Sequence, residues 1–339
     1  MALASESRRH VTVNDVARLA GVSTATVSRA VNSPDIVASE TRSRVFEAID
    51  RLEYRPNTAA RRLAGARTDT IGLTLPELSG PFFSELLTGV EEAARAAGYH
   101  LLVAATEPHS AVTPSLPSVD PLFVDGSIVL PDAASDRLVE RLAAGHGPAV
   151  LVEISHPHLP TVAFDGAVGA AAAVRHLVRD HGAQRVACLA GPEDAEASRH
   201  RETAWAAELE VAGLEVDPGL LVRGGWSEMD GARLVDGLLA AGRRFDALFA
   251  VNDETAIGAL RGLERAGLHV PADVRVCGFD DIPLAGWMRP ALTTVAAPPR
   301  ALGRVAVEVL LGRIAKRPTP LVTRLPTSLV IRSTCGCTQ

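Results

Sequence analysis

From Thr70 onward, apolar runs of strand length alternate with amphipathic segments of helical length. The predicted strands are Ile71–Leu75, His100–Ala104, Ser127–Leu130, Ala149–Val152, Val186–Leu189, Ala247–Val251 and Val274–Gly278. Helices are predicted between them, among them Phe82–Ala97, Ala167–Arg179, Arg201–Ala212 and Thr255–Ala266. This alternation is typical of parallel sheets covered by helices on both faces, and the strand total suits two subdomains. Ligands of such folds bind beyond the carboxyl ends of the strands, so we expect a ligand site in a cleft between the subdomains.

The first sixty residues have a different pattern, that of three short helices. Thr12 can cap a first helix, which Gly21 ends because glycine tolerates a positive φ. Ser23 can cap a second helix. A third begins near Ser39 and ends before Pro56, whose ring disfavours helix in the residue ahead of it. Two short helices joined by a turn with glycine predict a helix-turn-helix.

The second of these helices is the expected reader of DNA. Val27, Ala30 and Val31 form its buried side, so the other positions must face outward: Thr24, Ala25, Ser28 and Arg29. Arg29 can donate two hydrogen bonds to guanine, and Thr24 can touch a base edge or a thymine methyl group. The side chains suited to phosphate oxygens are those of Ser23, Ser28 and Asn32. The alternative at this point is a three-helix module that binds protein.

Charge is divided unevenly along the chain. Residues 1–67 carry 11 arginines against 7 acidic residues, a net charge of +4, whereas the rest of the chain has a net charge of −10. A small basic module joined to a large acidic one indicates a polyanionic partner for the first part only.

The stretch Val13–Asn32, VNDVARLAGVSTATVSRAVN, resembles the headpiece signature of the LacI family of transcriptional regulators nearly residue for residue. The resemblance implies that Thr24, Ala25 and Arg29 occupy base-reading positions. It also implies a homodimer, or a higher homo-oligomer, that binds a pseudo-palindromic operator in double-stranded DNA under the control of a small molecule.

The segment Asn57–Leu63 resembles the hinge helix of the same family, which pairs across the dimer and inserts a leucine into the minor groove. Asn57 can cap this helix, which is too short to be stable alone. Leu63 stands at the position of the inserted leucine, which would kink the duplex; the alternative is a linker leucine that packs on the next domain. The expected DNA contacts are therefore Thr12, Ser23, Thr24, Ala25, Ser28, Arg29, Asn32, Asn57, Ala60 and Leu63.

Several later segments, including Pro81-Phe82-Phe83 and Val276–Asp281 (VCGFDD), resemble the family and its periplasmic sugar-binding relatives. The resemblance implies an effector pocket formed by Phe82, Phe83, Asp165, Arg201, Trp226, Asn252 and Asp280. Carboxylates and a guanidinium can hold paired hydroxyls while an indole covers a sugar face, so a sugar or polyol is the first choice of effector. A nucleoside, a purine or another metabolite is the alternative. Each residue also has a purely structural interpretation, as a helix cap, an ion pair or core.

The chain departs from the family pattern at several positions. Gly80 stands where the family usually has asparagine, Ala204 replaces a glycine, and Ala296-Ala297 follow where a glutamine is frequent. The segment 107–123 is rich in proline where the family has a helix, and a regular helix is disfavoured there. This segment either changes the dimer interface or is a simple surface loop.

We therefore expect an all-α helix-turn-helix headpiece (1–56), a hinge and linker (57–67) and an α/β core (68–339) like a periplasmic binding protein. The core would consist of two doubly wound parallel-sheet subdomains, one of about 68–163 and 292–322 and one of about 164–291 and 323–339.

Other classes of protein fit less well. An enzyme is not expected, because the sequence has no Gly-rich phosphate loop, no G-x-S-x-G and no histidine pair at metal-ligand spacing. A solute-binding protein would need an export signal, and the first residues, MALASESRRH, lack its apolar core. No apolar run approaches the roughly 18 residues of a membrane span, so a cytoplasmic protein without a membrane partner is expected.

The four cysteines suggest no cofactor. Cys188 and Cys277 lie in apolar strand-like runs and should be buried and inert. Cys335 and Cys337 form a C-x-C pair near the end of the chain, without a neighbouring Cys or His cluster in the sequence. A metal site remains open there, but a frayed terminus is favoured, and no metal is assigned.

Overall fold

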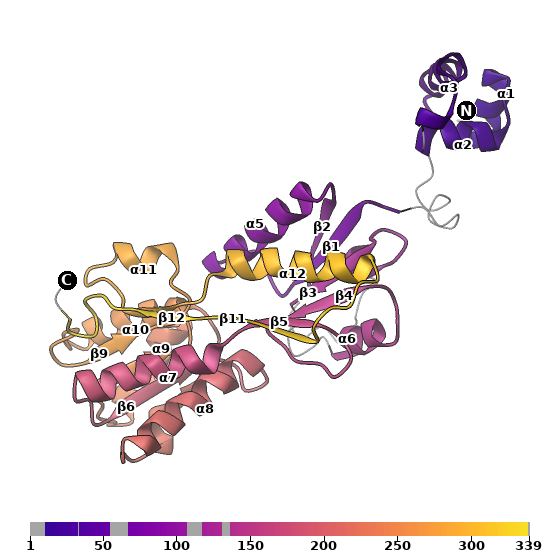
Figure 1. Ribbon diagram of the computed structural model, residues 1–339. Coiled ribbons are helices and arrows are strands. Elements are labelled where there is room, and N and C mark those ends of the chain that lie inside the picture. Colours follow the sequence, from indigo (N-terminus) through magenta and orange to yellow (C-terminus); the bar gives the residue numbers. More distant parts are fainter. Residues whose placement is uncertain (1–10, 33, 55–66, 107–116, 131–135, 338–339) are drawn as a thin grey trace, which may run out of the picture. The chain divides into compact units, whose positions relative to one another are not determined.

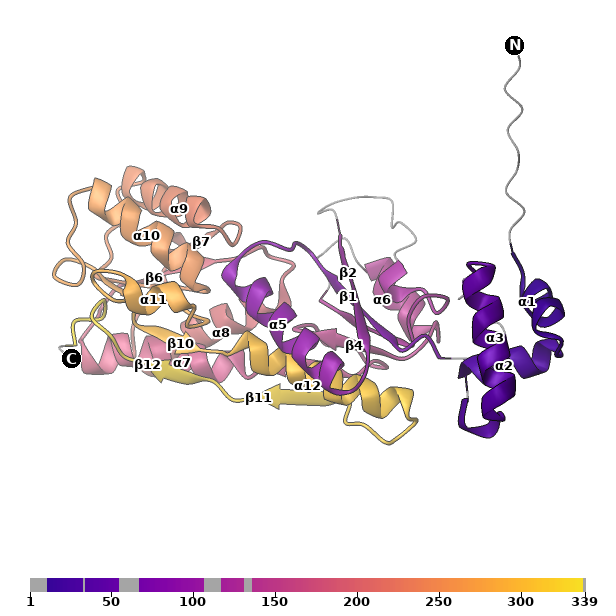
Figure 2. The same ribbon diagram turned by 90° about the horizontal axis from the view of Figure 1, so that it is seen from above.

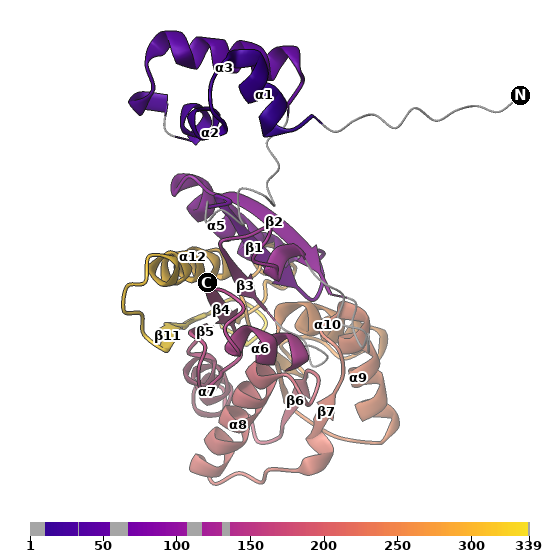
Figure 3. The same cartoon turned by 90° about the vertical axis from the view of Figure 1, so that its right-hand side faces the viewer.

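The structure is a computed structural model that describes residues 11–32, 34–54, 67–106, 117–130 and 136–337 (Figure 1). The chain divides into two compact units, residues 1–68 and 69–339. The first unit consists of α1 (Val13–Ala20), α2 (Thr24–Asn32), a 3-10 turn η1 (Pro34–Ile36) and α3 (Ser39–Arg51), drawn in indigo in Figure 3.

The helix ends of the first unit follow the predicted caps. The backbone N–H and the hydroxyl of Thr12 donate to Oδ2 of Asp15 at 2.9 and 2.7 Å, which fixes the start of α1. Gly21 ends α1 with a φ of 67°. Oγ of Ser23 accepts a hydrogen bond from the backbone N–H of Thr26 at 3.1 Å and so caps α2. The buried residues of the three helices form one small core: Val16, Ala17, Ala20, Val27, Ala30, Val45 and Ala48.

The second unit begins with a six-stranded sheet, the centre of the N-terminal subdomain. All paired neighbours are parallel, in the order β11-β5-β4-β3-β1-β2. The strands are β1 (Thr70–Leu75), β2 (His100–Ala105), β3 (Gly126–Val129), β4 (Ala149–Val152), β5 (Thr161–Phe164) and β11 (Val322–Leu325). Helices α5 (Pro81–Ala96) and α12 (Pro299–Ile314) lie side by side over one face (Figure 2), and α6 (Asp136–Ala143) covers the other.

A four-stranded parallel sheet in the order β7-β6-β8-β9 forms the C-terminal subdomain. Its strands are β6 (Val186–Ala190), β7 (Leu221–Arg223), β8 (Ala247–Ala250) and β9 (Arg275–Cys277). The helices pack in two pairs: α7 (Gly166–Arg175) with α8 (Glu196–Val211), and α9 (Glu228–Ala240) with α10 (Asp253–Arg265). The smaller elements are η4 (His176–Asp180), η5 (Pro218–Leu220), α11 (Pro283–Trp287) and the antiparallel pair of β10 (Thr294–Ala296) and β12 (Ser328–Val330).

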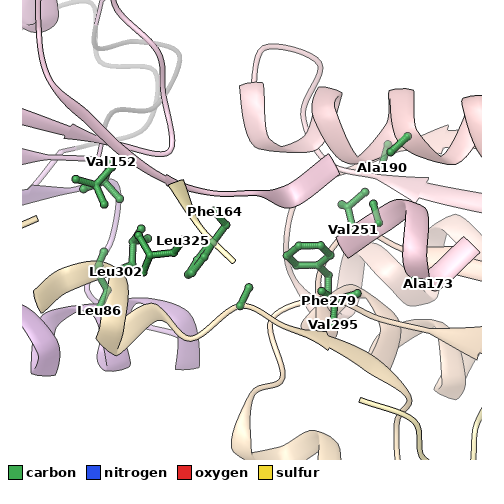
Figure 4. Packing of buried hydrophobic residues seen from close by; sticks show 14 of the residues in the cluster. Leu86, Val152, Phe164, Ala173, Ala190, Val251, Phe279, Val295, Leu302 and Leu325 are labelled. Carbon is green, nitrogen blue, oxygen red and sulfur yellow. The ribbon is translucent and has the colours of Figure 1, made fainter. Parts of the chain in front are cut away.

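Strand residues alternate between the two faces of each sheet. In β6, Cys188 and Ala190 belong to the core on one face, whereas Ala187 and Leu189 belong to the core on the other. One of these cores is continuous across both subdomains, from Leu86 of α5 to Phe279 beyond β9 (Figure 4). The fold prediction of two parallel sheets, each covered on both faces, is therefore confirmed.

The chain passes between the subdomains between β5 and α7, between β10 and α12, and between β11 and β12. Strand β11 pairs with β5, so the N-terminal subdomain extends to Leu325. Strand β10 instead bridges to the residues after β9, through Asp280 and Ala296. The subdomain borders thus lie a few residues beyond the bounds expected at 292 and 322.

Each predicted strand is present with ends that agree to within one residue. The predictions did not name the short strands β5, β7, β10, β11 and β12, and α6, α9, α11 and α12 were not among the helices given as examples. Helix α8 begins at Glu196 rather than at Arg201, because its first turn is polar and gives no apolar periodicity. Among the described residues, no helix combines the length and apolar character needed to cross a bilayer.

The proline-rich segment 107–123 is described from Pro117, where the 3-10 turn η2 (Pro117–Val119) begins. Ser118 is fully buried, and its Oγ hydrogen bonds with Oγ1 of Thr74 at 2.8 Å. Its carbonyl approaches Gly72 so closely that a Cβ there would lie 1.6 Å from it. This turn therefore packs on the sheet and is not a simple surface loop in its described part.

The expected frayed terminus is not found in the described residues. The Thr334 carbonyl accepts a hydrogen bond from the backbone N–H of Val276 at 2.9 Å, and its hydroxyl donates to the Val276 carbonyl at 2.7 Å. Cys335 is fully buried. Thr334 and Cys335 are held in place because Thr334 pairs with Val276 of β9. Cys188 and Cys277 are buried as predicted.

Candidate functional site

The exposed face of α2 presents the side chains predicted to read DNA. Val27 and Ala30 are buried, which leaves Thr24, Ala25, Ser28 and Arg29 exposed. Small side chains near the start of the helix leave room for a groove edge, and the Arg29 guanidinium extends the reach of the face. The base and phosphate contacts of these residues remain predictions.

The other predicted DNA contacts differ in what the structure says about them. Thr12 and Ser23 are exposed and cap α1 and α2, so each has a structural role beside its predicted one. Asn32 is the last residue of α2. The predicted hinge contacts Asn57, Ala60 and Leu63 lie outside the described residues.

Arg201 is the centre of the predicted effector site. It projects from α8 and is only 4% exposed. Its Nη1 donates to the Val251 carbonyl at 2.6 Å, and its Cζ lies 3.7 Å from the centre of the Phe279 ring. The carbonyl and the aromatic face together hold a buried guanidinium at the carboxyl ends of β8 and β9.

Asp280 lies beside this guanidinium without a hydrogen bond to it. Its Oδ1 is 3.7 Å from Nη1 of Arg201, and the side chain is 5% exposed. Burial raises the pKa of the Asp280 carboxyl well above its ordinary value, against the opposing pull of Arg201. Among the described residues, Oδ1 of Asp280 and Nε of Arg201 have no hydrogen-bond partner. Buried polar atoms are nearly always paired, so this pair is suited to a polar ligand.

Asp165 follows β5, and the residue after it approaches Arg201. It precedes α7, and a Cβ on the next residue, Gly166, would lie 3.5 Å from Nε of Arg201. Its backbone N–H donates to the Leu325 carbonyl at 2.8 Å, and its carbonyl accepts from Oγ1 of Thr327 at 3.1 Å. Asp165 is thus fixed where the chain enters the C-terminal subdomain.

Trp226 and Asn252 are held together by a hydrogen bond. Nδ2 of Asn252 donates to the Trp226 carbonyl at 2.8 Å, and Oδ1 accepts from the backbone N–H of Thr255 at 3.2 Å. Asn252 therefore caps α10, and a helix cap is one of the structural interpretations given above for the predicted effector residues. The Trp226 ring lies against Gly191, where a Cβ would come within 2.9 Å of Cη2.

Two acidic residues that the sequence did not single out belong to this region. Glu153 follows β4, and its Oε1 accepts from the backbone N–H of Phe164 at 2.7 Å. Burial raises its pKa, and Arg201 opposes that shift. Glu196 links the subdomains by accepting from the backbone N–H and hydroxyl of Ser155 at 2.9 and 2.7 Å. The strand-end rule that selected Asp165 would also have selected Glu153.

Glu254 faces the N-terminal subdomain at Gly80. A Cβ on Gly80 would lie 3.3 Å from Oε1 of Glu254. Burial, reinforced by the charges of Glu228 and Glu77, raises the pKa of Glu254 to about 7. An asparagine in place of Gly80 would meet this carboxyl, so the departure at Gly80 makes room for Glu254.

Phe82 and Phe83 start α5 beside Gly80. Their rings pack edge to face with centres 5.4 Å apart, and both are partly buried. Cδ2 of Phe83 would lie 3.7 Å from a Cβ on Gly80. The structure thus places Arg201 beside Asp280 and brings Gly166, the residue after Asp165, close to Arg201. It also pairs Trp226 with Asn252 and places Phe83 and Glu254 on either side of Gly80.

The comparisons with known proteins agree for both units. Residues 12–57 match the model for bacterial regulatory proteins of the lacI family, and residues 174–335 match the periplasmic binding protein-like domain. The chain is 35% identical over 320 residues to the ribose operon repressor of Escherichia coli K12, which covers 90% of this chain and 93% of that protein. It is 32% identical over 326 residues to the repressor PurR of Photobacterium profundum, which covers 95% of this chain and 97% of that protein.

The fold is also similar to a solved structure, the lac repressor dimer bound to operator and the anti-inducer ONPF. The TM-score is 0.80 at 31% identity, with 96% of this chain and 99% of that chain covered.

Proposed function

Because the chain belongs to the lacI family of bacterial regulatory proteins, it is a DNA-binding transcriptional repressor controlled by a small effector, and we propose that this effector is a sugar or related polyol. The observation that carries the proposal is the buried pair of Arg201 and Asp280, whose Nε and Oδ1 have no partner among the described residues. A hydroxyl can donate to the carboxylate and accept from the guanidinium at once, so vicinal hydroxyls suit the pair.

The partly buried Trp226 supports the same choice. The apolar face of a pyranose or furanose ring packs well on an indole, which leaves the hydroxyls for the polar side chains. The ribose operon repressor, a similar protein, is named for a sugar operon. Asp165, Asn252 and Glu153 supply further acceptors and a donor at the ends of their strands.

A purine or nucleoside is the second candidate. The indole of Trp226 can also stack on a base, and the similarity to PurR favours this candidate. The two candidates need different contacts from Arg201 and Asp280. A sugar uses the pair to hold adjacent hydroxyls, whereas a base needs donors and acceptors in the plane of its ring.

For DNA binding, the proposal places α2 in the major groove. Arg29 would read guanine, Thr24 and Ala25 would contact base edges, and Ser23, Ser28 and Asn32 would contact phosphates. A dimer would set two headpieces on a pseudo-palindromic operator, with Leu63 as the wedge between them. Effector binding would shift the balance between two arrangements of the subdomains and so between paired and unpaired hinges.

This proposal assigns the protein no catalytic step. Its site residues are arranged to hold a ligand, and binding energy alone can drive the change in operator affinity. The protein would act where the operator is, so we also propose a cytoplasmic location, on the ground of its DNA partner.

A melting-temperature screen tests the choice of effector. The purified chain is heated with pentoses, hexoses and disaccharides in one panel and with nucleosides and purine bases in another. A sugar at about 100 times its Kd should add about 2.7 kcal/mol to the free energy of unfolding and raise the midpoint by several degrees. Trp226→Ala should remove most of this rise. A rise with purines alone would select the second candidate.

DNA binding is tested by selecting sequences from a random pool and comparing Arg29→Ala with the wild type. Arg29→Ala should lower the preference for one base position by about 1 to 3 kcal/mol, while Arg18→Ala on α1 should leave it unchanged. Affinity for the selected DNA should fall steeply with salt, because several phosphates are contacted. An absence of sequence preference in the wild type at every salt concentration would refute the assignment.

A further inference from the structure

Two histidines that follow α7 and two cysteines near the end of the chain lie close together, outside the effector site. His176 and His181 lie at and just after the last turn of the α7 segment, and Cys335 and Cys337 belong to the final described residues. One potential ligand atom from each of the four lies within 4.8 Å of the other three. The histidines and the cysteines are separated by up to 161 positions in the sequence, so no local motif predicts that the four residues lie together.

The distances between these atoms match a tetrahedral metal centre. Nε2 of His181 is 3.2 Å from Nε2 of His176, and Sγ of Cys337 is 3.3 and 3.8 Å from the two nitrogens. A zinc ion with bonds of about 2.0 Å to nitrogen and 2.3 Å to sulfur separates its tetrahedral ligands by about 3.3 to 3.8 Å. These three ligand atoms therefore already lie at nearly the separations that the ion requires, and the ligand atom of Cys335 lies within 4.8 Å of them.

The backbone is shaped to bring the two imidazoles together. Residues five apart on an α-helix point about 140° away from each other, because each residue turns about 100°. The segment His176–Asp180 is instead a π-helical turn, whose wider coil brings position 181 back over position 176. The two rings meet edge to face with centres 4.7 Å apart. Such turns are rare and often occur at functional sites.

The neighbours orient the ligand atoms. Nδ1 of His176 is 2.7 Å from Oδ2 of Asp180, which leaves Nε2 directed at the cluster. A carboxylate on the far nitrogen is the usual support of a zinc-bound histidine. Gly336 has a φ of 100°, and this left-handed conformation turns the chain sharply between the two cysteines. Nε of Arg275 would lie 3.8 Å from a Cβ on Gly336, so a guanidinium borders this turn.

We propose that His176, His181, Cys335 and Cys337 bind a zinc ion that fastens the C-terminal segment to the end of α7. Two thiolates neutralise the ion, and a Cys2His2 set without an open position is typical of a structural rather than a catalytic zinc. The ion holds Thr334 in place against β9, because Cys335 follows it directly. The proposal does not depend on the identity of the effector.

The test begins with the full chain, purified in reducing buffer, loaded with zinc and dialysed. Elemental analysis should find about one zinc ion per chain. Replacement by Co2+ should give the visible bands of tetrahedral cobalt and an ultraviolet thiolate-to-cobalt band. Cys337→Ser and His181→Gln should each weaken zinc binding more than about 100-fold, and Asp180→Asn by about 10- to 100-fold.

Matched controls are Cys188→Ala, a cysteine buried in β6, and His269→Gln, an exposed histidine elsewhere; both should keep the zinc. A chelator should lower the melting temperature of the wild type and leave that of Cys337→Ser unchanged. The proposal is overturned by a wild type that retains almost no zinc and gives no thiolate-to-cobalt band. It is also overturned by a Cys335–Cys337 disulfide in the protein from reducing buffer, detected as a loss of two hydrogens by mass.

Discussion

Nη1 of Arg201 lies 3.7 Å from Oδ1 of Asp280, and the two buried side chains make no hydrogen bond with each other. Arg201 is held by the Val251 carbonyl and the Phe279 ring, so its position does not depend on Asp280. Buried ion pairs gain little net stability because desolvation offsets their attraction. The pair is thus better suited to ligand binding than to stabilising the fold.

Asp280→Asn should distinguish a role of Asp280 in ligand binding from a role in stabilising the fold. The free energy of unfolding should fall by less than the about 3 to 5 kcal/mol that loss of one partner of a buried ion pair usually costs. Arg201 keeps its bond to the Val251 carbonyl, and the substitution removes a carboxylate that lies near other acidic groups. Affinity for the sugar with the largest thermal shift should fall about 10- to 100-fold, since one charge-assisted hydrogen bond is lost. Urea unfolding and calorimetric titration measure the two quantities.

The control for this variant is Asp236→Asn, which breaks an exposed ion pair with Arg265 on the outer side of the subdomain. It should change neither stability nor affinity appreciably. Unaltered sugar affinity in Asp280→Asn would remove Asp280 from the effector site.

Gly191→Ala should displace the Trp226 ring, because the new methyl group would lie 2.9 Å from Cη2. We expect the sugar affinity to fall about 10-fold, while the fold is retained because the far end of a side chain can move. Gly237→Ala in α9 is the matched control. A Cβ there meets nothing within 4 Å, and the variant should be more stable by about 0.5 to 1 kcal/mol with unchanged affinity. Equal affinities in the two variants would contradict a stacking role for Trp226.

Gly72→Ala should destabilise the core domain severely. Its methyl group would lie 1.6 Å from the Ser118 carbonyl, and neither backbone can yield without disturbing the sheet or the buried turn η2. We expect a loss of about 3 kcal/mol or more in urea unfolding. Wild-type stability in this variant would show that the proline-rich segment does not pack on β1.

Glu254→Gln should alter how stability depends on pH. The pKa of Glu254 is raised from 4.5 to about 7, so the folded protein binds a proton that the unfolded chain releases. Stability of the wild type therefore falls as pH rises from about 4.5 to 7, and the glutamine variant lacks this loss. At pH 8 the variant should be more stable by about 1 kcal/mol, a value reduced for partial exposure to solvent.

Melting curves from pH 4.5 to 8 measure this difference. Glu264→Gln, on the exposed side of α10, should follow the wild type throughout. Parallel curves for Glu254→Gln and the wild type would mean that the carboxyl is already ionised in the folded protein at low pH.

The headpiece was predictable because its determinants are local. Thr12 and Ser23 cap helices within three residues of themselves, and Gly21 ends α1 through its own backbone freedom. Most of the central strands were predictable for a related reason: a strand buried on both faces is continuously apolar, as β4 is. Short or edge strands such as β7 and β11 are only partly buried, and the same pattern does not mark them.

The effector residues were named by resemblance, and the strand-end rule explains why they converge, yet Glu153 and Glu254 were not named. Their importance depends on burial, which raises the pKa of both, and burial depends on what the other subdomain covers. The role of Gly80 was not predictable for the same reason, because it depends on the Glu254 carboxyl that faces Gly80 in the folded chain.

The sequence by itself determined the three-helix unit, the alternation of strands and helices, and the surface of α2, since each depends on contacts between residues a few positions apart. Only the tertiary structure decided that Ser118 is buried on Gly72 and that Cys337 lies 3.3 Å from His181, 156 positions earlier. Such contacts arise because folding closes long loops, and the pattern around either partner does not encode the distance to the other.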